Sequence, residues 1–342
     1  MRVKLEEVCK RIYAGGDVPK DRYSEVMTEE YSVPIYANAE KDNGLYGYTD
    51  KAREEELSIT VAARGTIGFT AIRREPFLPV VRLITVVPDT DKVSERYLYY
   101  ALKNCKPQSS GTSIPQLTVP DIKKNSLELY DISKQEHIAD QLDKVNRVIE
   151  LRRQELSTLD NLIKARFVEM FGNPIINSKN LETRPLKDVL ILKAGDFTAA
   201  SDISDEPTET NMYPCFGGNG IRGYVAEYNQ DGEYSLVGRQ GALSGNVQYA
   251  SGKFKNTEHA LLVTPIVEMN SIWLNQLLMN LELKRYQTGA AQPGLSVKNL
   301  QEIQILCVPA EEQNQFADFV NQVDKSKFVK INRFISVENN IH

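Results

Sequence analysis

An internal repeat limits the fold of this 342-residue chain more than any other feature. Residues 111–146 align without gaps on residues 289–324, at a constant offset of 178 positions. Identical pairs in this alignment include Gly111 and Gly289, Pro115 and Pro293, Leu117 and Leu295, and Gln135 and Gln313. Upstream, the glycine-containing segments 44–48 and 65–68 align on 220–224 and 241–245. A repeat of this length predicts two domains of one fold, not a single core.

Each repeat changes from a strand-like to a helix-like pattern. Between about Leu5 and Leu129, short apolar or β-branched runs alternate with Gly, Pro and Asn clusters, which predicts an irregular, β-rich α+β domain with a helix over 95–102. After Asp131 the period becomes helical, and Ser133 with Glu136 resembles a capping box. Steps of four and three give the seam Ile138, Leu142, Val145, Ile149, Arg152, Leu156, Leu159, Ile163, Arg166 and Met170. Eight of these ten are apolar, as in a coiled coil.

A second, weaker helical seam follows Pro309. It comprises Phe316, Val320, Val323, Lys327, Lys330, Phe334 and Val337. Two such helices can bury their stripes against each other or against a partner, and an antiparallel pair gives the chain a pseudo-twofold axis. The predicted class is therefore α+β, with two β-rich domains joined by long antiparallel coiled-coil helices. The predicted segments are a first domain 1–132, a central helix 133–172, a second domain 173–308 and a shorter distal helix 309–342.

Composition and motifs argue against several classes of protein. The four cysteines are far apart and only three histidines are present, so neither a disulfide framework nor a zinc cluster is expected. We expect no metal and no cofactor. The N-terminal segment has no apolar core and no run of 18 apolar residues occurs, which predicts a cytoplasmic chain without a membrane partner. The net charge of −5 does not exclude a locally basic DNA-binding face.

The sequence supports no enzyme signature, so no catalytic residue is predicted. Gly218–Gly223 fits the GxGxxG string, but a strand-like segment follows it instead of the helix that a dinucleotide site needs. The chain has no phosphate-binding loop, and it lacks the Pro-Pro pair expected in an adenine methyltransferase active site. His259, beside Glu258, is better explained as a structural or DNA-contacting residue than as a catalytic base.

Basic, amide and aromatic residues surround the glycine-rich turns of both repeats. Arg, Lys, Asn and Gln can contact phosphates or base edges, and glycine lets a backbone approach DNA closely. The simpler alternative is that such residues only solvate loops, but their occurrence in duplicated loops favours binding. The predicted DNA-binding residues are Lys41, Tyr46, Arg64, Thr66, Arg73, Arg74, Ser113 and Gln116, with Asn219, Arg222, Arg239, Gln240, Asn246, Lys253, Lys255 and Gln292 in the second repeat.

The ordered combination of these segments resembles the specificity subunit of type I restriction-modification enzymes. The segments that carry the resemblance are Gly111–Val119 with its copy Gly289–Val297, the helix starts at Ser133 and Glu311, and the ending Leu159–Gly172 of the first helix. The resemblance implies that each domain recognises one half of a split double-stranded DNA site. It also implies that the helices set the spacer and dock two modification (methyltransferase) subunits, and that restriction subunits bind through the complex.

One question about the second helix and two alternative functions remain open from the sequence. The second helix lacks an ending like that of the first, so its docking of a second modification subunit is unsettled. The chain could also be the recognition module of a fused restriction-methylation enzyme, or a coiled-coil protein scaffold that does not recognise DNA. Charge reversal at the loop arginines separates the last possibility from DNA binding.

Overall fold

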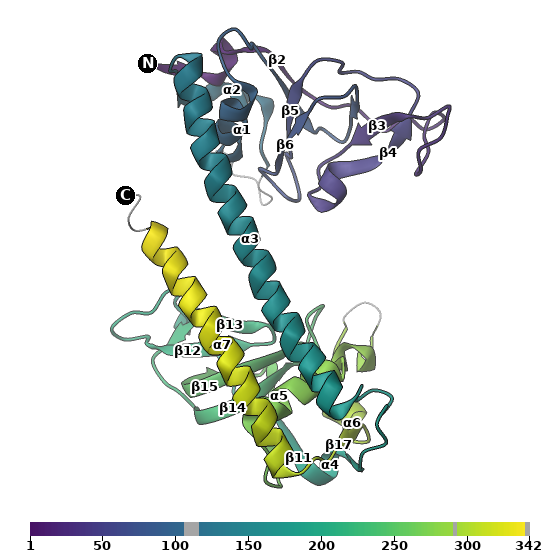
Figure 1. The fold of residues 1–342 in the computed structure, drawn as a ribbon, viewed down its shortest axis with the longest axis vertical. Coiled ribbons are helices and arrows are strands. Elements are labelled where there is room, and N and C mark those ends of the chain that lie inside the picture. The colour runs from purple at the N-terminus through teal and green to yellow at the C-terminus, as the bar shows by residue number, and fades with distance from the viewer. Residues whose placement is uncertain (106–115, 290–292, 339–342) are drawn as a thin grey trace. The chain divides into compact units, whose positions relative to one another are not determined.

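A computed structural model describes residues 1–105, 116–289 and 293–338 (Figure 1). The contacts divide the chain into two compact units, unit 1 (Met1–Leu151) and unit 2 (Arg152–His342). The boundary falls inside one helix, α3 (Ile132–Phe171). Each unit combines strands and helices, as the α+β prediction requires, and each is described below by itself.

The described part of unit 1 contains three small sheets. Their strand orders are β1-β9, β2-β8-β5-β6 and β4-β3-β7. The strands are β1 (Arg2–Lys4), β2 (Cys9–Ala14), β3 (Val33–Tyr36), β4 (Leu45–Thr49), β5 (Ser58–Val61), β6 (Thr70–Arg73), β7 (Leu78–Pro79), β8 (Ile84–Pro88) and β9 (Ser126–Glu128). The helices besides α3 are η1 (Leu5–Glu7), η2 (Lys41–Gly44), α1 (Glu95–Lys103) and α2 (Val119–Lys124).

Unit 2 contains a two-stranded sheet, β10-β17, and a six-stranded sheet of order β11-β16-β14-β15-β12-β13. The strands are β10 (Thr183–Pro185), β11 (Leu190–Ala194), β12 (Tyr213–Gly217), β13 (Gly220–Val225), β14 (Gln230–Gly238), β15 (Val247–Asn256), β16 (Ala260–Pro265) and β17 (Gln304–Leu306). The helices are α4 (Leu186–Val189), η3 (Ala200–Asp202), α5 (Ser271–Asn280), η4 (Leu283–Tyr286), α6 (Val297–Leu300) and α7 (Ala310–Glu338).

The two units repeat one topology. The order β2-β8-β5-β6 of unit 1 corresponds to β11-β16-β14-β15 of unit 2. In unit 2 the long strand β15 continues until it pairs in parallel with β12, whereas in unit 1 the separate strand β7 makes the equivalent parallel pairing with β3. The internal repeat of the sequence is therefore a repeat of the fold.

Helix α1 packs on α3 within unit 1 (Figure 1). Ser94 caps α1 by accepting a hydrogen bond from the backbone N–H of Tyr97 (3.5 Å), and the helix buries Leu98 and Leu102 in the core. Arg96 points to α3, where it pairs with Glu136 (3.0 Å), Asp140 (2.6 Å) and Asp143. Polar contacts thus hold the exposed side of this helix pair, while apolar side chains fill the side that faces the sheet.

In unit 2, α7 runs antiparallel to the last turns of α3. Phe316 lies 5.4 Å from Phe167 between ring centroids, and Lys327, eleven residues later on α7, binds Asp160, seven residues earlier on α3 (2.7 Å). Phe167, Phe171, Phe316 and Trp273 of α5 are each 0% exposed and contact one another edge to face. This aromatic cluster joins both helices to the core of unit 2.

Two details of the helical prediction are wrong. The start of α3 is capped by Asp131, whose carboxylate accepts from Lys134 N (3.0 Å), whereas Glu136 of the predicted capping box bonds to Arg96. The predicted seam also missed Phe167 and Phe171, which are both 0% exposed, and it included Val145, which is 39% exposed. The reason is that α3 buries different faces in the two units, so one repeating stripe does not describe it.

Candidate nucleic-acid interface

The turn between β5 and β6 presents polar residues from unit 1. Gly65 and Gly68 have φ of 69° and 86°, and Gly68 N donates to Ala62 O (3.0 Å), which makes a tight turn. Arg64 and Thr66 are exposed on this turn, and Arg64 Nη2 donates to Gln116 Oε1 (2.8 Å). A hollow of about 560 Å³ lies beside this turn.

The loop between β14 and β15 has the same form in unit 2. Two glycines within it, Gly241 and Gly245, have φ of 76° and 88°. A Cβ at Gly245 would lie 2.5 Å from Lys284 N, so only glycine lets this loop pack on η4. Asn246 Nδ2 donates to Asn219 Oδ1 (2.7 Å), which brings the turn between β12 and β13 against the loop.

Backbone hydrogen bonds show which loop residues are equivalent. Leu117 N donates to Ala63 O (3.0 Å), and its repeat partner Leu295 donates to Arg239 O (2.8 Å). Arg64 therefore occupies the position of Gln240, and both side chains are exposed. In the same way, the backbone N–H groups of Tyr48 and Tyr224 donate to Ser24 O and Ser204 O. Tyr46 is therefore the equivalent of Arg222, and both side chains are exposed.

Arg82 and His259 form a further equivalent pair that is not among the predicted DNA-binding residues, although His259 is interpreted from the sequence as a structural or DNA-contacting residue. Gly15 N donates to Leu83 O (2.8 Å) and Gly195 N to Ala260 O (3.3 Å), so the preceding residues Arg82 and His259 are equivalent. His259 O accepts from Arg239 N (2.9 Å), beside the glycine loop, and its Nε2 lies 3.1 Å from Glu258 Oε1. An offset of 177 between the two residues was the signal that could have found them.

Arg73 does not belong with the exposed residues. Its side chain is buried, with the residue only 3% exposed, and its Nη2 and Nε donate to Asn43 O (2.7 Å) and Thr60 Oγ1 (3.1 Å). The guanidinium also lies 3.6 Å from the ring centroid of Tyr36. Its guanidinium is therefore buried within unit 1, so we remove Arg73 from the predicted interface.

The remaining predicted residues differ in their surroundings. Lys41 is exposed in η2, and Arg74 is exposed but bound to Glu95 of α1 (3.1 Å). Lys253 lies over the ring of Tyr228 (4.8 Å), and the Lys255 side chain, 18% exposed, reaches Asp196 (3.5 Å). Lys255 is thus partly committed to a structural ion pair. Ser113 and Gln292 lie outside the described residues.

The described residues offer little for metal or thiol chemistry. Among them, no group of three or more His, Cys, Asp or Glu side chains is arranged to hold a metal ion. Burial raises the pKa of Cys9 to about 12 and that of Cys105 to about 11, which keeps both thiols protonated near neutral pH. Within the described part of the chain, no helix is both long and apolar enough to cross a membrane.

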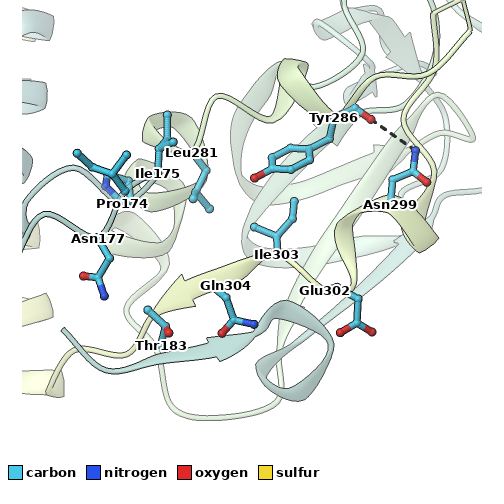
Figure 2. A pocket seen from close by; sticks show the side chains of 11 residues that line it. Pro174, Ile175, Asn177, Thr183, Leu281, Tyr286, Asn299, Glu302, Ile303 and Gln304 are labelled. Carbon is cyan, nitrogen blue, oxygen red and sulfur yellow. Dashed lines mark hydrogen bonds between the residues drawn. The ribbon is translucent and has the colours of Figure 1, made fainter. Parts of the chain in front are cut away.

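A hollow of about 560 Å³ in unit 2 lies apart from the predicted binding residues. Figure 2 shows its lining, which comes from the segment after α3, from η4 and from the start of β17. Asn299 Nδ2 donates to Tyr286 O across one wall (3.5 Å), and Glu302 pairs with Lys187 (2.5 Å). Glu302 is thus tied to a neighbouring lysine at the edge of the hollow.

Comparison with known proteins identifies the family. The family model described as type I restriction modification DNA specificity domain matches residues 1–161 and again 178–338. The EcoprrI specificity subunit of Escherichia coli is 28% identical over 333 residues, covering 92% of this chain and 82% of that protein. A putative type I specificity subunit of Mycoplasma pneumoniae is 34% identical over 171 residues, covering 47% of this chain and 50% of that protein.

A solved structure agrees at the level of fold. The crystal structure of the type I restriction-modification S subunit from M. genitalium matches with a TM-score of 0.56 at 16% identity, covering 99% of this chain and 92% of that one. The duplicated topology and the two family-model matches divide the sequence in the same way. This chain therefore belongs to the type I restriction-modification DNA specificity family and carries its domain twice.

Proposed function

We propose that this chain is the non-catalytic DNA-recognition subunit of a type I restriction-modification complex. The family and the duplicated domains support this proposal. Residues 1–132 and 173–308 are the proposed recognition domains, and 133–172 and 309–342 are the helices that set the spacer and dock the modification subunits. Restriction subunits join through that assembly. We also propose that the complex acts on DNA in the cytoplasm.

The observation that carries the proposal is that equivalent loop positions hold different side chains. Arg64 is replaced by Gln240, Tyr46 by Arg222 and Arg82 by His259. Arginine makes its best bidentate contact to guanine and glutamine to adenine, so the same loop on two domains can select different bases. This arrangement suits a bipartite DNA site whose two halves differ in sequence.

Mapping methylated adenines tests this function. The chain is reconstituted with its modification subunit and supplied with S-adenosylmethionine and random-sequence DNA. We expect methylation at one split site, with two different half-sites separated by a fixed number of unselected base pairs. An assembled, active complex that methylates adenines without regard to sequence would contradict the proposal. The same reaction without this chain is the control, and it should give no site preference.

A further inference from the structure

A buried glutamine joins α3 to the recognition domain of unit 1. Gln135 is 0% exposed, and its Oε1 accepts from the backbone N–H of Ser94, the residue that caps α1 (2.9 Å). Its Nε2 donates to Lys92 O (3.0 Å) and Tyr130 O (2.8 Å). One side-chain amide thus connects the start of α3, the strand-to-helix connection before α1 and the α1 cap.

The same connection occurs in unit 2 with different neighbours. Gln313 is 3% exposed, and its Oε1 accepts from the backbone N–H of Asn270, which caps α5 (2.8 Å). Its Nε2 donates to Val308 O (2.7 Å), five residues earlier, as Gln135 does to Tyr130. Gln135 and Gln313 are also matched by the repeat alignment.

The contacts around the two glutamines are not shared. In unit 1, Arg96 of α1 pairs with three carboxylates of α3. Its counterpart is Ile272, at the offset of 176 that also pairs the helix caps Ser94 and Asn270. Near the same place, unit 2 has a bond from Asn270 Nδ2 to Asn314 Oδ1 (2.9 Å). The backbone bonds made by the glutamine are therefore the common element of two otherwise different helix–domain contacts.

Hydrogen bonds are directional, and buried polar groups lose stability when they are left without partners. Turning α1 on α3, or α5 on α7, would break the bonds of the glutamine amide to backbone groups on both sides. We propose that Gln135 and Gln313 are positioning residues, each holding its recognition domain at one angle to its helix and thereby restricting the spacer length that the complex accepts. This inference rests on the proposed function.

The test replaces each glutamine with methionine, which has similar length but cannot replace the amide bonds. Gln141→Met on α3 and Gln315→Met on α7 are matched controls, because both residues are exposed on the same helices. Each variant complex methylates two duplex libraries. In the first, both half-sites are fixed and the spacer is changed by one or two base pairs; in the second, the preferred spacer is kept and the half-sites are randomised. Thermal unfolding of each variant checks that it is folded.

We expect the wild-type complex to prefer one spacer strongly. Gln135→Met and Gln313→Met should reduce that preference by about tenfold while both half-site sequences stay the same. The two controls should keep the wild-type profile. An unchanged spacer profile in both folded glutamine variants would overturn the inference, as would a change in half-site sequence. If the wild-type complex shows no bipartite site, the proposed function fails and not this inference alone.

If the methionine variants do not fold, Gln135→Asn and Gln313→Asn decide the question. Asparagine keeps the amide but shortens the side chain by one methylene, so it can keep only part of the bonding. A partly relaxed spacer preference supports the inference. A wild-type profile in both asparagine variants contradicts it, because the bonds of the full-length amide would then not set the angle.

Discussion

Replacing Phe316 with alanine is expected to lower the free energy of unfolding of unit 2 by about 3–5 kcal/mol. Phe316 is 0% exposed and lies 5.4 Å and 5.7 Å from Phe167 and Phe171 between ring centroids. Its loss would leave a cavity where α7 meets α3, and rigid helix ends cannot close such a cavity completely. The effect should exceed that of most single substitutions.

Denaturant unfolding followed by tryptophan fluorescence measures this loss. The chain has one tryptophan, Trp273, which is buried and lies 6.0 Å from Phe171, so its emission reports on unit 2. Phe328→Ala is the control, because Phe328 is on the same helix but 64% exposed, and it should change stability by no more than about 0.5 kcal/mol. Equal losses for the two variants would contradict the described core.

Reversing two loop charges should have the largest effect on DNA binding. Arg64 and Arg239 are both exposed beside the glycine loops. If each contacts the DNA backbone or a base edge, Arg64→Glu with Arg239→Glu should weaken binding by the reconstituted complex by about 100-fold or more at 0.1 M salt. The slope of log affinity against log salt concentration should also become shallower, by about one unit for each lost phosphate contact.

Binding is measured by titrating a labelled duplex at several salt concentrations. Arg184→Glu is the matched control, since Arg184 is exposed on β10, outside the predicted DNA-binding residues and outside the helices proposed to dock the modification subunits. It should leave affinity and slope close to those of the wild type. If the double reversal also leaves both unchanged, the chain would be better explained as a protein scaffold.

Much of the fold could be predicted because the repeat and the change of period are visible in the sequence itself, without knowledge of which residues meet in space. The helix predicted over 95–102 is α1, and the repeat alignment pairs residues that make equivalent backbone bonds, such as Leu117 and Leu295. The burial of Arg73 could not be predicted, because it depends on Tyr36, Asn43 and Thr60, which are distant in sequence.

The helices show a second limit. A stripe of residues at steps of four and three predicts an apolar face only when one partner covers the whole helix. Helix α3 contacts α1 in unit 1 through Arg96 and the aromatic cluster in unit 2 through Phe167, so its buried face changes along its length. The alignment also contained Gln135 and Gln313, but their burial and their backbone partners became visible only in the folded chain.

The most direct test of the central claim is the methylation site of a chimera. Residues 1–132 are exchanged for the equivalent domain of a related specificity subunit that recognises a different sequence, and methylated adenines are mapped. If each repeat recognises DNA independently, one half-site should become that of the donor, while the other half-site stays that of the parent. A site that changes in both halves, or in neither, would contradict the account.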